Sequence, residues 1–159
     1  MKTKTIITEL TQEDLVNLLC TATYGSSWLS CYAPDKKEVG ITDEDCLEDE
    51  WAKVLLGGKS IICTDYYAEG ECYGNLPCNI DEEDNAEYTL SLQDILDGLQ
   101  KCADGTFSHT NYDEADNGDT EKSWIAKCFQ HFKEDTGEMD NPEAESLMQI
   151  ILFGELIYG

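Results

Sequence analysis

Apolar residues recur in several stretches of the chain with the 3.6-residue period of an amphipathic helix. The first stretch follows Thr11, whose hydroxyl precedes Asp14 by three residues, the spacing of a capping box. It ends at Gly25, which is followed by two serines. Its apolar stripe consists of Leu15, Leu18, Leu19 and Ala22. The pattern predicts a helix that buries one face.

Four further stretches show the same period. Thr42, with Asp45 three residues later, predicts a helix that runs to Leu56 and stops at two glycines. Ser91 and Asp94 predict the start of the next helix in the same way. The inward stripes of these two helices are Leu47, Trp51, Val54 and Leu55, and then Leu92, Ile95, Leu96 and Leu99. A fourth stripe consists of Trp124, Ile125, Cys128, Phe129 and Phe132.

The last helix is expected to begin at Asn141 as the cap, with Pro142 at its first position, and to end at Gly154. Its inward residues are Ala144, Leu147, Met148, Ile151 and Leu152. Residues 156–158 after it are expected to form either a terminal strand or a plug.

Strand-like segments separate the helices. Residues 59–67 are rich in β-branched and aromatic side chains and predict a strand, and 87–90 predict a second one antiparallel to it. Residues 28–32 form a third candidate. Residues 70–85 and 103–119 are turn-rich, polar segments expected to be loops. Together these features predict an α+β fold, with about five helices packed around a small antiparallel β-sheet or hairpin.

The 159 residues fit one domain, with no internal repeat or long linker. We therefore expect a single domain over 1–159, with inserted acidic loops near 68–86 and 104–120. No apolar run reaches the ~18 residues of a membrane span, and the start of the chain lacks a signal-peptide pattern. These features predict a cytoplasmic protein, in a bacterial host cell given the resemblance described below.

Eight cysteines occur in the chain. In a cytoplasmic protein they are expected to be reduced thiols. Four of them occupy apolar positions typical of small buried side chains, namely Cys20, Cys63, Cys102 and Cys128.

The charge of the chain is strongly negative, at −24, with 34 acidic residues against 10 basic ones. All ten cations are lysine, so the chain lacks the bidentate guanidinium that recognises phosphates. Direct binding to nucleic acid or to an anionic membrane is therefore disfavoured by net charge and by residue type.

Three blocks of the chain form a recognisable set: residues 10–15 (LTQEDL) with 20–22 (CTA), residues 88–92 (YTLSL) with 96–99 (LDGL), and residues 152–159 (LFGELIYG). Together they resemble a group of small, acidic, uncharacterised proteins from phages and mobile elements of gut bacteria. A pair of glycines, Gly57 and Gly58, precedes the first central strand as in that group. The resemblance covers about half of the chain and implies a phage setting. It carries over no functional residues.

The acidic residues are clustered along the chain. Six acids fall within residues 43–50, and four follow one another at 81–84. Other acids gather in 113–121 and 134–145.

One interpretation of these acidic clusters is a solvated surface that keeps the protein dissolved. The other is mimicry of a polyanion such as DNA. A globule of this mass exposes roughly 8,000 Å², or one net charge per ~330 Å². Duplex DNA carries one charge per ~100 Å². Mimicry therefore requires the acids to gather on about a third of the surface.

Metal sites and catalytic groups are weakly represented in the sequence. Residues 113–121 resemble a calcium loop, but the third position is Ala115 and the twelfth is Trp124. Cys72 and Cys78 lack the Cys-x-x-Cys spacing of zinc sites. The alternatives for this pair are zinc binding with help from Cys46 or His109, or a disulfide if the protein leaves the cytoplasm. We expect no metal and no cofactor.

No catalytic motif accompanies the two histidines, His109 and His131, and His131 is expected at the surface or at a helix end. We expect a protein that is not an enzyme.

The sequence favours an acidic phage-type protein that binds and inhibits a basic protein, such as a nuclease or another nucleic-acid enzyme of the host or its defence system. Anti-CRISPR proteins and DNA mimics are inhibitors of this kind. The expected partner-binding residues are Asp43, Glu44, Asp45, Glu48, Asp49, Glu50, Trp51, Asp81, Glu82, Glu83 and Asp84. One alternative is a binder of a small molecule or signalling nucleotide, for which Lys36, Lys37 and Lys59 are the available cations. Another is a structural phage accessory protein without an inhibitory role.

Overall fold

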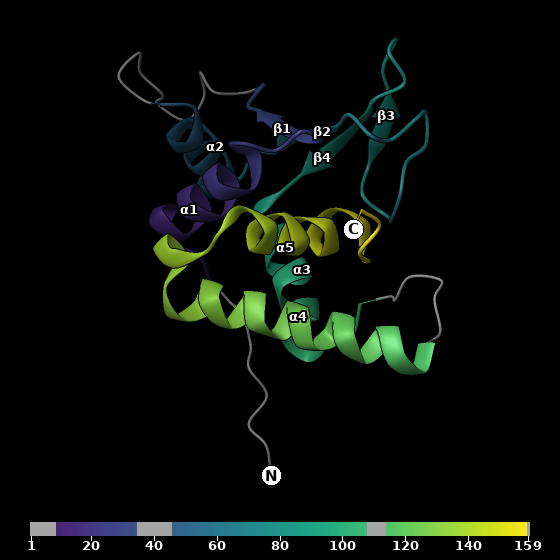
Figure 1. Cartoon of the computed structure of the whole chain (residues 1–159). Coiled ribbons are helices and arrows are strands. Elements are labelled where there is room, and N and C mark those ends of the chain that lie inside the picture. Colours follow the sequence, from purple (N-terminus) through teal and green to yellow (C-terminus); the bar gives the residue numbers. More distant parts are fainter. Residues whose placement is uncertain (1–8, 35–45, 108–113, 159) are drawn as a thin grey trace.

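The structure is a computed structural model, which describes residues 9–34, 46–107 and 114–158. Figure 1 shows the sheet at one end of the molecule, α4 at the other end, and α5 between them. The helices are α1 (Gln12–Thr23), α2 (Leu47–Leu56), α3 (Leu92–Asp104), α4 (Glu114–Glu134) and α5 (Asn141–Phe153), with a short 3-10 turn, η2 (Thr136–Glu138). The strands are β1 (Leu29–Tyr32), β2 (Ile61–Asp65), β3 (Cys78–Ile80) and β4 (Ala86–Leu90). The expected α+β fold is confirmed.

The four strands form one antiparallel sheet in the order β1-β2-β4-β3. Alternate residues of β2 and β4 point to the helical side and are buried, among them Ile61, Cys63, Tyr88 and Leu90. The residues between them face the other side of the sheet. This is the usual arrangement of an antiparallel sheet with one packed face and one face open to solvent.

Helix α5 is the central element of the helical part. It contacts α1, α3 and α4, and it is buried on nearly all sides. Helix α3 approaches α5 closely at Gly98, because glycine has no side chain. A Cβ atom at this position would lie 2.6 Å from the Cα of Ile151 on α5. Asn141, in the first turn of α5, donates from its side-chain amide to the carbonyl of Thr21 at 2.8 Å, near the end of α1. Because the carbonyls at a helix C-terminus lack intrahelical partners, this bond fixes the two helices together.

Capping boxes begin three of the helices. Those of Thr11 with Asp14 and Ser91 with Asp94 are present as predicted. In α5 the cap is Asp140, paired with Glu143, one residue earlier than expected. The Asp140 carboxylate accepts from the Glu143 backbone N–H at 2.9 Å, while the side chain of Asn141 is engaged with the Thr21 carbonyl.

Several sequence-based expectations were wrong in detail. Helix α2 begins at Leu47, which is 56% exposed rather than inward, since the first turn of α2 lies at the margin of the core. The predicted cap Thr42 lies outside the described residues. The strand predicted over 59–67 spans only Ile61–Asp65, and the chain turns at Tyr66 and Tyr67.

Two predicted loops contain regular structure. Strand β3 was missed because it has three residues and no buried alternation. Helix α4 begins at Glu114, within the segment predicted as a loop, although Asp, Asn and Gly are weak helix formers. The calcium-loop pattern in this segment therefore lies on a helix from Glu114 onward, and Asp113 lies outside the described residues.

Replacing Gly98 with alanine is expected to destabilise the protein by about 1–3 kcal/mol, because the new methyl group forces α3 and α5 apart in a packed core. Urea denaturation measures the change in unfolding free energy. Gly137→Ala is the matched control, since a Cβ there lies 3.5 Å from its nearest neighbour, Asp135. Equal stabilities of the two variants would contradict the close packing of α3 on α5.

Candidate functional site

The open face of the sheet carries a shallow groove of about 520 Å³. Its lining residues come from β1, β2, β4 and the turns that follow β2 and β3. They are Ser30, Cys31, Tyr32, Thr64, Tyr66, Asp81, Glu82, Glu83, Asn85 and Glu87. We call this surface the acidic groove. Ser30, Thr64 and Glu87 are cross-strand neighbours in register and form a row across its floor.

The turn between β3 and β4 is built by Asp81. One carboxylate oxygen of Asp81 accepts from the backbone N–H groups of Glu83 at 2.8 Å and Asn85 at 2.9 Å. The other accepts from the Asn85 side-chain amide at 3.1 Å. These donors, the Asn85 N–H foremost, lower the pKa of Asp81. Asp81 is thus a structural carboxylate that stays ionised.

Asp84 completes the turn in the left-handed region, with φ at +63°. That conformation is uncommon for a residue other than glycine, although aspartate tolerates it. Glu82 and Glu83 lie between these two turn-forming residues and are exposed. Asp84 is exposed as well, but within 82–84 only the two glutamates line the groove.

Tyrosines line the side of the groove formed by β1 and the turn after β2. Tyr32 is 48% exposed and Tyr66 is 50% exposed. The Tyr66 hydroxyl lies 2.9 Å from the Ser30 hydroxyl. Partial burial and the nearby Glu87 carboxylate raise the pKa of Tyr32, so its phenol stays neutral. Neutral aromatic rings beside carboxylates suit a cation, which each group attracts.

Charge is strongly segregated around this groove. Residues 60–100 contain ten acidic side chains and no lysine, arginine or histidine. The lysines in the described part of the chain lie on α2, directly after it, and on α3 and α4, at Lys53, Lys59, Lys101, Lys122, Lys127 and Lys133. Figure 1 shows α4 at the end of the molecule opposite the sheet. None of these described lysines lines the groove. Lys36 and Lys37 lie outside the described residues.

The other predicted acidic cluster lies elsewhere. Glu48, Asp49 and Glu50 form the first turn of α2, where negative charge stabilises the helix N-terminus. Glu48 accepts from the Tyr24 hydroxyl at 2.8 Å, which raises the pKa of Tyr24 to about 12. Since α2 packs beside β1 and β2 while β3 is the far edge of the sheet, the structure does not bring 48–50 and 81–84 together (Figure 1). Asp43, Glu44 and Asp45 lie outside the described residues.

The prediction that Trp51 contacts a partner at the surface is wrong, because its side chain is only 3% exposed and belongs to the core. Its indole N–H has no hydrogen-bond partner among the described residues. Helical periodicity placed Trp51 inward, and the structure agrees with that part of the prediction. The exposed aromatic side chains of the site are instead Tyr32 and Tyr66.

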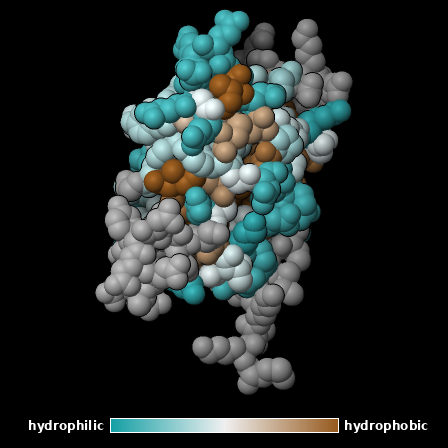
Figure 2. Space-filling view, turned by 90° about the vertical axis from the view of Figure 1, so that its right-hand side faces the viewer, coloured by the Kyte–Doolittle hydropathy of each residue, from teal (hydrophilic) through white to brown (hydrophobic). Residues whose placement is uncertain are grey.

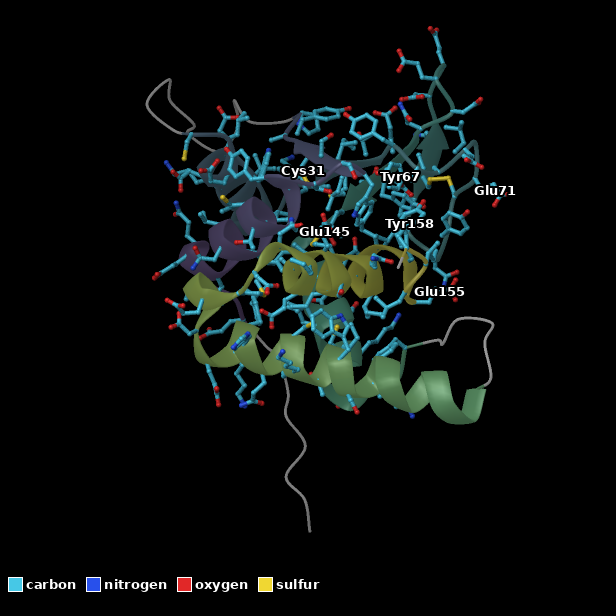
Figure 3. The ribbon with its side chains drawn as sticks, viewed as in Figure 1. Cys31, Tyr67, Glu71, Glu145, Glu155 and Tyr158 are labelled. Carbon is cyan, nitrogen blue, oxygen red and sulfur yellow. A yellow bond between two sulfur atoms is a disulfide. The ribbon has the colours of Figure 1, made fainter. Side chains whose placement is uncertain are left out.

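Behind the sheet, a buried carboxylate fixes the end of the chain. Asp65 is fully buried, and it accepts from the Tyr67 backbone N–H at 2.9 Å and from the Tyr158 hydroxyl at 2.7 Å. Figure 3 shows Tyr67 and Tyr158 side by side, and their rings meet edge to face at 5.6 Å. Burial raises the pKa of Asp65 above 3.8, while these two donors act against the rise. Residues 156–158 thus form the plug, one of the two predicted alternatives.

The cysteines differ from the expected uniform set of thiols. Cys72 and Cys78 form a disulfide, with Cα atoms 6.2 Å apart, so the expectation of reduced thiols is wrong for this pair. The short loop through Pro77 brings both residues within bonding range. The other six cysteines are free. Cys63, Cys102 and Cys128 are buried as expected, whereas Cys20 is only half-buried.

The candidate metal ligands of the sequence lie apart in the part of the chain that the structure describes. In the described ranges, no three His, Cys, Asp or Glu side chains are placed to hold a metal ion. His131 lies near the end of α4, and its Nδ1 atom is 2.6 Å from the buried carboxylate of Glu143. His109 lies outside the described residues. Among the described helices, none is long and apolar enough to cross a membrane.

Comparison of the chain with protein-family models, curated proteins and solved structures gives no match. The resemblance to acidic phage proteins therefore stays a prediction. Figure 2 shows the side of the molecule that carries β3, where hydrophobic residues form small patches within a mostly hydrophilic surface. The groove and its charge are the strongest functional signal of the described surface.

Replacing Tyr158 with phenylalanine is expected to lower the free energy of unfolding by about 1.5–3 kcal/mol, because it leaves a buried carboxylate with one donor fewer.

Asp65→Asn preserves both contacts, since an amide accepts from Tyr67 and donates to Tyr158. In the wild type, the raised pKa means that folding favours the neutral form of Asp65. The stability that this gives the fold is fully present below pH 3.8 and is lost as the pH rises through the folded-state pKa.

The stability of Asp65→Asn relative to the wild type should therefore increase as the pH rises above 3.8. Thermal unfolding across the pH range measures this difference. Asp97→Asn, which removes a charge from an exposed position on α3, is the control. A difference between Asp65→Asn and the wild type that does not change with pH would refute a raised pKa at Asp65.

Proposed function

We propose that this protein acts by stoichiometric binding of a basic protein surface through the acidic groove, and not by catalysis. The observation that carries the proposal is the groove itself. Four carboxylates and two exposed tyrosines line one open concavity. The four carboxylates and Tyr66 come from residues 60–100, which contain no cation. A lysine or arginine side chain entering it gains attraction from the carboxylates and from the ring faces.

The partner class follows from the same charges. Surfaces rich in lysine and arginine are typical of proteins that handle nucleic acid, since they bind phosphates. An acidic surface without interspersed lysines competes for such a site and accelerates the encounter. With the phage resemblance, this supports inhibition of a nucleic-acid enzyme of the host or its defence system. A phosphate-bearing nucleotide is disfavoured in this groove because the carboxylates repel it.

The proposal assigns different weights to the acids. Glu82, Glu83 and Glu87 are the expected contacts, because the carboxylate of Asp81 is engaged by its own turn. The acids of α2 supply a more distant negative field, since Glu48 and Asp49 already accept hydrogen bonds from Tyr24 and Cys46.

Neutralising the three groove glutamates as Glu82→Gln, Glu83→Gln and Glu87→Gln is expected to weaken binding of a fluorescent lysine- and arginine-rich decapeptide about tenfold to a hundredfold. Fluorescence anisotropy gives the Kd. The affinity of the wild type should also fall steeply from 50 to 300 mM salt (about 14 to 6 Å Debye length), because the attraction is screened.

The matched control replaces three acids outside the groove, as Asp97→Asn, Glu138→Gln and Glu145→Gln, which changes the net charge by the same amount. Equal losses in both triple variants would show that the total charge matters and the groove does not. Binding that is insensitive to salt would exclude the electrostatic mechanism.

Affinity capture from a bacterial lysate at low salt identifies the natural partner. The wild type and the control variant are expected to retain the same basic, nucleic-acid-handling protein, and the groove variant is expected to lose it. Mass spectrometry of the eluates distinguishes the three baits. A partner retained equally by the groove variant would contradict binding through the groove.

A further inference from the structure

Two of the free cysteines face each other across the edge of the sheet. Cys31 on β1 and Cys63 on β2 are partners in the antiparallel register. Their sulfur atoms lie 3.4 Å apart, although the two residues are separated by 32 positions in the chain. Figure 3 shows Cys31 on β1, beside the strands at the end of the molecule opposite α4.

The backbone pairing at this position suits a covalent bond. The Tyr66 N–H donates to the Trp28 carbonyl at 2.8 Å, so Trp28 and Tyr66 form a hydrogen-bonded pair. Hydrogen-bonded and non-hydrogen-bonded pairs alternate along an antiparallel ladder. Three residues further on, Cys31 and Cys63 are therefore a non-hydrogen-bonded pair, in which Cα atoms are ~4.5 Å apart and side chains are closest.

That separation falls inside the range of Cα distances that disulfides span, ~4.4–6.8 Å. The sulfur atoms need to approach by only about 1.4 Å to reach a bond length of ~2.05 Å. Side-chain rotation supplies such a movement, and the strand register already matches the bonded geometry.

The two thiols differ in their access to solution. Cys63 is fully buried, whereas Cys31 is half-buried on an edge strand. The hydrogen bond with Cys31 and burial raise the pKa of Cys63 well above its ordinary value. A reagent in solution therefore reacts with Cys31 first, and the buried Cys63 thiol reacts in the second step.

We propose that Cys31 and Cys63 are a redox-modification site, at which a low-molecular-weight disulfide such as oxidised glutathione converts the two thiols into a cross-strand disulfide. In the first step the Cys31 thiolate attacks the reagent, forms a mixed disulfide and releases one glutathione thiolate. In the second, Cys63 gives its proton to solvent and its sulfur attacks the Cys31 sulfur, which expels the second glutathione thiolate. The two cysteines are oxidised and one glutathione disulfide is reduced to two thiols.

The modification has a structural consequence at the acidic groove. Ser30 and Tyr32, on either side of Cys31, both line the groove. A covalent bond between β1 and β2 fixes the register of these residues against Thr64 and Ile62. It also closes a long loop that contains α2, which restricts the unfolded chain. The proposal rests on the thiol geometry and is independent of the proposed binding function.

The experiment treats the full-length native protein with increasing oxidised glutathione, blocks the remaining thiols under denaturing conditions, and maps the peptides by mass spectrometry. The expected product is a linked pair of peptides containing Cys31 and Cys63, with the loss of the free thiol at both positions. Its formation should accelerate with pH, because the second step requires the Cys63 thiolate. The melting temperature should rise on the order of 10 °C, given the length of the loop closed.

Variants separate the two steps. Cys63→Ala is expected to accumulate a stable glutathione adduct on Cys31, and Cys31→Ser is expected to give neither adduct nor cross-link at Cys63. Cys20→Ser, at a half-buried thiol on α1, is the control and should oxidise like the wild type. Cross-linking absent under conditions that modify the exposed Cys46 would overturn the proposal. So would equal adduct levels on Cys31 in the wild type and in Cys63→Ala.

Discussion

The burial of α5 is the constraint on which the rest of the described structure depends. Nine of its thirteen residues are buried, because α1, α3, α4 and the aromatic residues below the sheet surround it. A helix covered on nearly all sides needs neighbours with very small side chains where backbones approach. Gly98 supplies that on the α3 side, and Gly74 does so where the loop after β2 crosses the carbonyls of Leu152 and Phe153. Each neighbour is positioned by its contact with this one helix.

The C-terminal end of α5 connects the helical core to the sheet. The ring of Phe153 lies 5.4 Å from that of Tyr88 on β4 and 5.8 Å from that of Trp28, just before β1. After Gly154 the chain turns back, and Gln149 holds it by accepting from the backbone N–H groups of Ile157 and Tyr158 at 2.8 Å. Tyr158 then reaches Asp65 at the end of β2. The helical face of the sheet is thereby filled, and its other face is left open for the groove.

The open face of the sheet gathers carboxylates in a folded protein that their mutual repulsion destabilises. Carboxylates gathered without lysines repel one another, which costs stability, and the fold offsets part of this cost locally. Asp81 is stabilised by the N–H groups of its own turn. A cation bound in the groove, as proposed, would relieve the remaining repulsion among Glu82, Glu83 and Glu87. A surface of this kind therefore gains most from a partner that brings lysine or arginine.

The sequence by itself determined the elements that depend on local chemistry. The capping boxes at Thr11 and Ser91, and the apolar stripes of α1 and α3, all follow from neighbouring residues, and so does the strand-forming character of β2 and β4. The acidity of 81–84 was equally visible. Only the tertiary structure decided which acids share a surface, because that depends on residues distant in the chain. It separated 48–50 from 81–84 and brought Tyr32 and Tyr66 beside Glu87. It also placed Cys31 against Cys63, since strand register is set by the packing of the whole sheet and not by either strand alone.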